Sequence, residues 1–201
     1  GRTGTRIGEL QQHFDEFEVI DIYDVLFQQI NYRILCEGAQ GFQLDVDWGD
    51  YPYVTSSHCT VGSVCLNGIP PYKIRRVFGV MKAYETYVGN KTHFTDDTDP
   101  TFKRIQEVGN EFGATTGRPR HVRWTDMDSV IQAVNVNGVT DIIINKIDVL
   151  NDVGVYKLVG GGELHEYQTE HEFKTAVEIN LKEHCDRRIQ SIRWSTSPST
   201  I

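Results

Sequence analysis

Apolar residues recur at helical spacing near the beginning of the chain. They lie three or four positions apart, so a helix over residues 21–33 would have one hydrophobic face. The members of this face are Ile22, Val25, Leu26 and Ile30. Two runs that follow, at residues 34–36 and 76–84, are rich in apolar residues and predict strands.

The second half of the chain continues this alternation. Thr125 is placed to cap a helix that runs to Val134, and the apolar run 142–144 predicts a strand after it. Beyond the glycine triplet at 160–162, which marks a flexible turn, a helix over 173–185 is expected.

A last strand is expected around residues 191–195. Alternating strands and helices predict an α/β fold with a mostly parallel sheet and flanking helices. Ligand loops are then expected at the carboxyl ends of the strands. Because no repeat or low-complexity linker interrupts the pattern, residues 1–201 are interpreted as one domain.

Composition narrows the class of protein. The chain has 201 residues, 39% of them hydrophobic, which is enough to bury a core. A formal net charge of -8 argues against a general nucleic-acid binder, which needs a basic surface. No apolar run approaches the ~20 residues of a membrane span, and no signal-peptide core is present, so we expect a cytoplasmic protein without a membrane partner. Four cysteines without CxxC spacing predict reduced thiols.

Candidate chemistry begins at the stretch Asn145-Lys146-Ile147-Asp148, which directly follows the 142–144 strand. At the end of a buried strand, a carboxylate at Asp148 can accept hydrogen bonds from N1–H and the exocyclic amine of a guanine, while the Lys146 stem covers the ring. Polar residues also end strands simply where the chain reaches solvent. The string therefore indicates a guanine site, with strand-end polar residues as the alternative.

The loop at residues 113–120 contains two hydroxyls, glycines and two guanidinium groups. Arg118, Arg120 and Arg123 lie within six positions of one another. Since positive charge on an acidic protein is concentrated here, these arginines form a candidate anion pocket.

Six short motifs follow one another along the chain. They are EGAQG at 37–41, DVDWG at 45–49, YPYVTSS at 51–57, KAY at 82–84, NEFGATTGRPR at 110–120 and NKIDVL at 145–150. In this order and spacing they resemble the adenylosuccinate synthetase family. The resemblance implies a P-loop-like ligase fold and a homodimer that joins L-aspartate to C6 of IMP with GTP hydrolysis, a step of purine (AMP) biosynthesis.

The resemblance also implies roles for individual residues. Gln40 and Thr55 match positions that hold the purine nucleoside monophosphate. The aspartate pocket is implied to contain Val88, Thr115, Thr116, Gly117, Arg118 and Arg120. The nucleoside triphosphate is implied to contact Lys146, Asp148, Ser195 and Ser197.

Three positions depart from the family pattern. Tyr87 stands where the family has Arg, residues 90–97 replace a Gly-Pro-Phe-Pro-Thr-Glu stretch, and Ser197 replaces Gly. Substrate discrimination can differ at these positions. The alternative within the same class is therefore the phage branch, which makes 2-aminoadenylosuccinate from dGMP and uses ATP.

The family's glycine-rich GDEGKG loop and the catalytic histidine after it have no counterpart before Glu37. We therefore interpret the chain as the C-terminal portion of a larger synthetase that lacks this loop. The general base, the general acid and the ligands of Mg²⁺ are expected elsewhere, and no metal ligand is assigned here. From a different class, the alternative is a catalytically incomplete nucleotide-binding lobe. His58 and His121 are expected to make polar or surface contacts.

Overall fold

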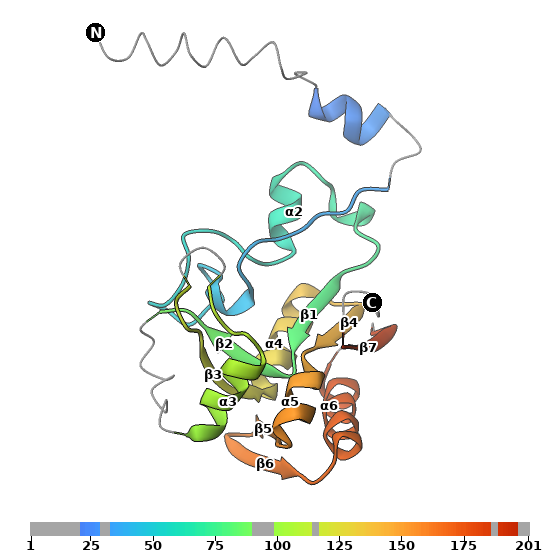
Figure 1. The fold of residues 1–201 in the computed structure, drawn as a ribbon. Helices are drawn as coiled ribbons and strands as arrows, with labels where there is room; N and C mark the ends of the chain where they lie inside the picture. Colours follow the sequence, from blue (N-terminus) through green and yellow to red (C-terminus); the bar gives the residue numbers. More distant parts are fainter. Residues whose placement is uncertain (1–20, 29–32, 90–98, 114–116, 186–188, 197–201) are drawn as a thin grey trace, which may run out of the picture.

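Two sheets lie together with their helices (Figure 1), and their buried side chains form one hydrophobic core. The computed structural model describes residues 21–28, 33–89, 99–113, 117–185 and 189–196. Three parallel strands form the first sheet in the order β1-β4-β7: Phe78–Lys82 (β1), Asp141–Asn145 (β4) and Ser191–Ser195 (β7). The isoleucines of β4 suit its central position, because β-branched side chains pack well on a pleated surface.

A buried carboxylate ties the amino ends of these strands together. Asp141 is 2% exposed and accepts hydrogen bonds from the guanidinium of Arg76 and from the hydroxyls of Thr140 and Ser191. The Arg76 guanidinium and the two hydroxyls hold the pKa of Asp141 well below its ordinary range, against the effect of burial. These hydrogen bonds thereby connect the segments at the amino ends of the three strands.

The second sheet has four strands in the order β2-β3-β5-β6. They are Tyr84–Tyr87 (β2), His121–Asp126 (β3), Tyr156–Gly160 (β5) and Glu163–Tyr167 (β6). β3 and β5 are parallel, whereas β2 pairs with β3 and β5 with β6 in the antiparallel sense. The predicted α/β fold with a parallel sheet and flanking helices is thus confirmed, and the antiparallel pairs are an addition that the sequence pattern did not predict.

The predicted strand over 76–84 is in fact two strands. The chain leaves the first sheet at Ala83, whose amide still donates to the carbonyl of Asn145 at 2.9 Å, and enters the second sheet at Tyr84. Ala83 and Tyr84 are each 1% exposed. Because both parts are apolar, hydrophobicity alone does not mark the corner between them.

Two helices begin directly after an aspartate that caps their first turn. Pro100–Val108 (α3) begins after Asp99, whose carboxylate accepts from the amide of Thr101 at 2.8 Å. Met127–Asn137 (α4) is capped by Asp126 through the amide of Asp128. The predicted cap at Thr125 was wrong by one residue, because β3 runs into α4 without a loop.

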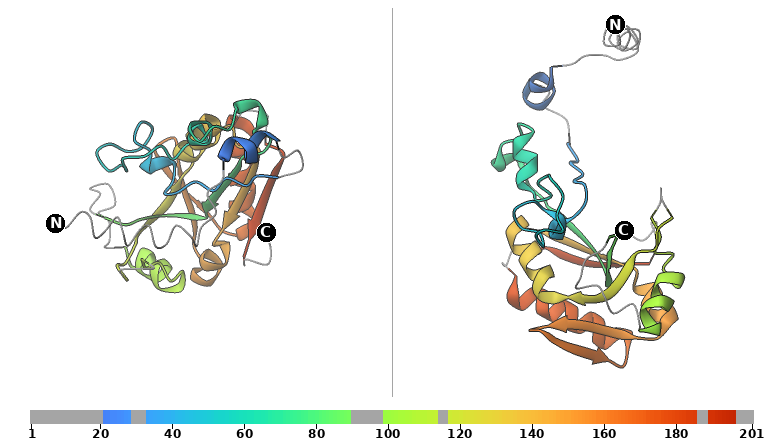
Figure 2. Two further views of the ribbon diagram at one scale, coloured as in Figure 1. Left: turned by 90° about the horizontal axis from the view of Figure 1, so that it is seen from above. Right: turned by 90° about the vertical axis from the view of Figure 1, so that its left-hand side faces the viewer.

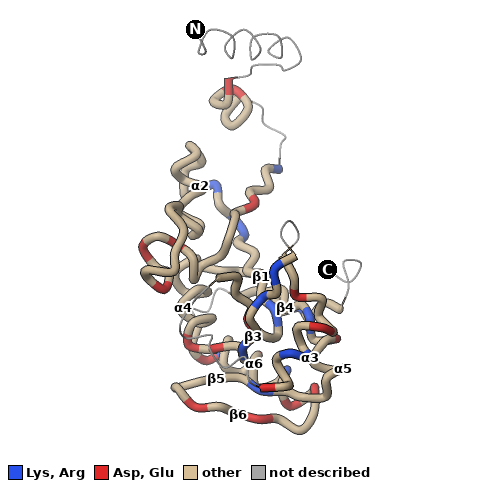
Figure 3. The backbone as a smooth tube through the Cα atoms, turned by 60° about the vertical axis from the view of Figure 1, so that its left-hand side comes forward, with Lys and Arg blue, Asp and Glu red and all other residues tan. Residues whose placement is uncertain are grey.

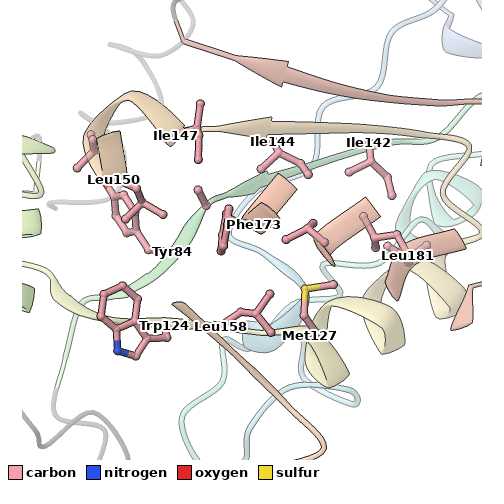
Figure 4. Close-up of a cluster of buried hydrophobic side chains, with 14 of the residues drawn as sticks. Tyr84, Trp124, Met127, Ile142, Ile144, Ile147, Leu150, Leu158, Phe173 and Leu181 are labelled. Carbon is pink, nitrogen blue, oxygen red and sulfur yellow. The ribbon is translucent and has the colours of Figure 1, made fainter. Parts of the chain in front are cut away.

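The helix Glu170–His184 (α6) supplies much of the core. Its Phe173 and Leu181 are fully buried and lie near Ile142 and Ile144 of β4 (Figure 4). The helix also contacts β5 and β6. The helix predicted over 173–185 is therefore confirmed, with an earlier start. Ile147–Val153 (α5) completes the helices around the sheets and contacts α3.

Among the described residues, the part of the chain that precedes β1 contains short helices. They are Asp24–Gln28 (η1), Phe42–Leu44 (η2), Gly62–Leu66 (α2) and Pro71–Lys73 (η3). η1 and α2 stand away from the sheets (Figure 2, right). Of the predicted helix over 21–33, residues 22–28 are helical and 29–32 lie outside the described residues.

The strand predicted at 34–36 was wrong. Ile34 and Leu35 are exposed, and no strand in the described part of the chain pairs with them. An apolar run becomes a strand only where another strand accepts its backbone hydrogen bonds.

All four cysteines are free thiols. Within the described ranges, no helix has both the length and the apolar character needed to cross a bilayer.

Candidate functional site

The carboxyl ends of the three parallel strands form one polar edge. Lys82, Asn145 and Ser195 are register partners there, one from each strand. Ser195 is 3% exposed, and the side-chain oxygen of Asn145 is buried without a hydrogen-bond partner in the described part of the chain. A buried acceptor without a donor is costly, so this edge is suited to receive a donor from a ligand.

Lys146 leaves this edge in an unusual conformation. Its φ of 67° and ψ of 18° lie in the left-handed region, which is uncommon for residues with a side chain. The ammonium group donates to the carbonyl of Gly109, just after α3, at 2.9 Å. The turn therefore directs the Lys146 stem across the edge and fixes its tip to another segment.

Asp148 lies in the first turn of α5 and is partly buried. Its carboxylate makes no hydrogen bond or ion pair within residues that the structure describes. Since partly buried carboxylates are normally paired, the oxygens of Asp148 are available to a ligand that presents N–H donors. Lys146 and Asp148 thus lie on the same strand-to-helix connection, as the sequence predicts.

A second group of charges surrounds Glu111, which is 1% exposed. Lys82 donates to both carboxylate oxygens at 2.8 Å, and the hydroxyl of Tyr84 donates to Oε1 at 2.8 Å. Arg120 Nη1 donates to Oε2 at 3.1 Å. Burial alone would raise the pKa of Glu111, but the donors from Lys82 and Tyr84 and the nearby positive charges hold it below its ordinary value.

The same contacts affect Tyr84. Burial, followed by its hydrogen bond to the Glu111 carboxylate, raises the pKa of the Tyr84 phenol far above its ordinary value. Glu111 is therefore an anion and Tyr84 a neutral donor at neutral pH. The sequence pattern assigned no role to Lys82, Tyr84 or Glu111, although all three occur within the quoted KAY and NEFGATTGRPR motifs.

The arginine loop folds back on itself before β3. Phe112 and Pro119 form an isolated bridge, and the amide of Gly113 donates to the carbonyl of Arg118 at 2.8 Å. Gly117 has a φ of 63°, a left-handed conformation that favours glycine. Thr115 and Thr116 lie outside the described residues.

The three arginines of the predicted anion pocket have different surroundings. Arg118 is exposed, and Arg120 binds Glu111. Arg123 is paired with Glu85, with 2.6 Å between its Nε and Oε2. Basic positions gather close to β1 and β4 (Figure 3) even though the chain is acidic overall. All three arginines have partners within the protein, and Arg118 and Arg120 are the two that the resemblance implies as candidates for binding a ligand anion.

Gln40 and Thr55 lie on neighbouring loops. Gln40 is exposed with a φ of 61°, and its side-chain oxygen is 4.0 Å from the sulfur of Cys59. The amide of Thr55 donates to the carbonyl of Leu44 at 2.8 Å. Cys59 closely follows the YPYVTSS segment and Leu44 closely follows the EGAQG segment, so each of the two segments implied to hold the monophosphate contacts a residue that flanks the other.

Residues near the end of β2 are only partly described. Val88 is 47% exposed, and Tyr87 lies against Gly89, whose φ of 136° suits glycine. The divergent stretch 90–97 lies outside the described residues, as does Ser197.

Among described residues, Asp45, Asp47 and His58 are the group that could hold a metal ion. The carboxylate of Asp45 is buried and already accepts from the amides of Asp47, Trp48 and Cys59. Mg²⁺ prefers oxygen ligands in a near-octahedral arrangement with several waters, so a histidine and a saturated carboxylate do not fit it. His58 instead lies 3.4 Å from Asp47, as a surface contact.

Comparisons with known proteins give the same family as the motifs. A family model described as adenylosuccinate synthetase matches residues 4–197. The adenylosuccinate synthetase of Chlorobium chlorochromatii is 42% identical over 175 residues, covering 80% of this chain and 40% of the relative. That of Paramecium tetraurelia is 45% identical over 135 residues, covering 64% of this chain and 31% of the relative.

A solved structure shares the fold. Fully ligated adenylosuccinate synthetase from Plasmodium falciparum aligns with a TM-score of 0.69 and 26% identity, covering 81% of this chain and 47% of that chain. The present chain spans about two fifths of the length of the curated relatives it matches. Because the family model covers nearly the whole sequence, this chain belongs to the adenylosuccinate synthetase family.

Proposed function

We propose that this chain supplies nucleotide- and aspartate-binding parts of a carbon–nitrogen ligase that joins L-aspartate to C6 of IMP while GTP is hydrolysed. The observation that supports it most directly is the carboxylate of Asp148. It is partly buried and without a hydrogen bond among the described residues, and it lies two residues after Lys146 at the end of β4.

Guanine suits this carboxylate better than adenine does. The Watson–Crick edge of guanine presents two donors, N1–H and the exocyclic amine, and a carboxylate accepts both. Adenine presents an unprotonated N1 in the same place, which a carboxylate repels. Sites that bind through hydrogen bonds discriminate strongly against ligands that leave polar atoms unpaired. GTP is therefore the proposed triphosphate.

The two remaining substrates are proposed at other segments. Arg120, with Arg118, presents guanidinium groups that can pair with the carboxylates of L-aspartate. Gln40 and Thr55 offer an amide and a hydroxyl to the nucleoside monophosphate without adding charge. The resemblance to the family implies that the reaction uses Mg²⁺. Asp45, Asp47 and His58 do not fit that ion, so no step is assigned to a metal held by this chain.

The test uses the full-length protein that contains this sequence. Product formation would be measured with IMP, L-aspartate and GTP, and separately with dGMP and ATP. We expect turnover of IMP that depends on GTP and L-aspartate. Turnover of dGMP alone, or a preference for ATP, would overturn the proposal in favour of the phage-type reaction. The oligomeric state is a separate question, and sedimentation of the same sample would test the proposed homodimer.

The isolated 201 residues are proposed to bind nucleotide without turnover. Calorimetric titration with GTP, alongside the activity assay, tests this separately. Heat of binding without product formation is the expected result, and measurable catalysis by the isolated chain would contradict it.

A further inference from the structure

The hydrogen-bonding capacity of Glu111 and Lys82 is fully used. Lys82 has three N–H donors, and it gives two to Glu111 and one to the hydroxyl of Thr86 at 3.0 Å. Glu111 has about four acceptor positions, which receive the two bonds from Lys82, one from Tyr84 and one from Arg120. Neither residue has capacity left for a ligand.

Arg120 differs from these partners. A guanidinium has five N–H donors in a planar fork, and within the described residues only Nη1 is bonded, to Glu111. Its main chain is held as well, because the amide donates to the carbonyl of Glu111 at 2.9 Å and the carbonyl accepts from Gln106 at 2.6 Å. The side chain of Arg120 is 32% exposed. One side of the fork is therefore fixed in the protein while the remaining donors can reach a ligand.

We propose that Glu111 is a positioning residue for the dicarboxylate substrate, which it orients indirectly by holding the guanidinium of Arg120. Free arginine side chains lose rotamer entropy when they bind, and a fork that is already fixed loses less. The buried anion also keeps Lys82 paired, so Arg120 remains the cation of this cluster that can still bind a carboxylate. This inference rests on the proposed function.

Asp141, in the first sheet, provides a matched control for Glu111. Like Glu111, it is a buried carboxylate with an arginine partner and hydroxyl donors, and it is 2% exposed. It lies at the amino end of β4, where Arg76 binds it, whereas Glu111 binds Lys82 at the carboxyl end of β1. If Glu111 served folding alone, replacing either carboxylate by its amide would have the same kind of effect.

The experiment compares Glu111→Gln with Asp141→Asn in the full-length protein, measuring KM for L-aspartate, KM for IMP and kcat. Because a charge-assisted contact is loosened, Glu111→Gln should raise the aspartate KM by about tenfold while the IMP KM stays within roughly twofold. Asp141→Asn should lower the unfolding midpoint and leave both KM values unchanged.

A double-variant cycle tests whether Glu111 acts through Arg120. Once Arg120 is replaced by Leu, adding Glu111→Gln should raise the aspartate KM no further, because the group that Glu111 orients is gone. If Glu111→Gln fails to fold, Glu111→Asp keeps the charge but retracts it by one methylene, and it should raise the aspartate KM to a smaller extent.

Two negative results have different meanings. A wild-type protein without aspartate-dependent turnover would overturn the proposed function itself. Aspartate-dependent turnover with an unchanged aspartate KM in Glu111→Gln, or an equal rise in Asp141→Asn, would overturn the role of Glu111 and leave the proposed function standing.

Discussion

The ammonium group of Lys146 donates a hydrogen bond to the carbonyl of Gly109 across 2.9 Å, joining the end of β4 to the end of α3. Gly109 also lies beside the hydroxyl of Tyr84, which donates to Glu111. The segment that follows α3 therefore contacts both the candidate nucleotide residues and the buried cluster around Glu111.

Gly109→Ala should destabilise the protein. Its backbone conformation is ordinary, but an added Cβ would clash with the Tyr84 hydroxyl and lie 2.8 Å from the carbonyl of Ile105. Overpacking of this kind costs about 1–3 kcal/mol of unfolding free energy, measured by urea denaturation. Gly62→Ala is the control, since its Cβ would meet only Thr60 Oγ1 at 3.5 Å. Equal midpoints for the two variants would contradict the steric explanation.

Asp148→Asn should weaken GTP binding. The amide must present a donor where guanine also presents donors, so unpaired polar atoms remain, at a cost of about 1–3 kcal/mol of binding free energy. Xanthosine triphosphate should bind the variant better than it binds the parent, because its C2 oxygen accepts from the new amide. Calorimetry with both nucleotides measures this exchange.

The control for this change is Asp152→Asn. Asp152 is exposed on the same helix, so the variant loses the same charge away from the polar edge. Parent-like GTP affinity is expected for it. If Asp148→Asn also binds GTP as tightly as the parent, Lys146 and Asp148 are strand-end polar residues and not a guanine site.

Arg120→Leu should raise the KM for L-aspartate by roughly ten- to hundredfold, because a bidentate charged contact is lost. The variant should also lose about 1–2 kcal/mol of stability, since Glu111 keeps Lys82 and Tyr84 but loses one donor. Kinetics and urea denaturation measure the two effects.

Arg104→Leu is the corresponding control for Arg120→Leu. Arg104 is exposed and donates to the carbonyl of Asp152, so its replacement removes an arginine from the surface of α3. Its aspartate KM should equal that of the parent. A parent-like KM in Arg120→Leu would remove Arg120 from the substrate pocket.

Acid should weaken the fold through Asp141. Its pKa is lowered in the folded state, chiefly by Arg76 and the hydroxyls, relative to about 3.9 when unfolded. The contribution of the Asp141 carboxylate to the free energy of unfolding is therefore fully present above about pH 4. It is lost as the pH falls below that value toward the folded-state pKa. Urea midpoints of the parent and Asp141→Asn should differ at pH 7 and at pH 5 by the same amount, and the difference should be smaller at pH 3. A constant difference at all three pH values would contradict this assignment.

Local patterns predicted the elements whose residues determine their own conformation. The strand at 142–144, the helix over 173–185 and the strand at 191–195 were confirmed, because periodic burial and caps are local properties. The strand predicted at 34–36 was wrong, and the strand at 76–84 proved to be two strands. Both cases depend on which other strand lies alongside, and the local pattern does not contain that information.

The sequence by itself determined the α/β class, the order of the motifs and the position of Lys146 and Asp148 at the end of a buried strand. Only the tertiary structure decided that Glu111 is buried and that it binds Lys82, Tyr84 and Arg120. Hydrophobic periodicity reports which face of an element is buried, but a buried carboxylate requires donors from segments distant in sequence. Those donors come together only when β1, β2 and the loop before β3 have packed.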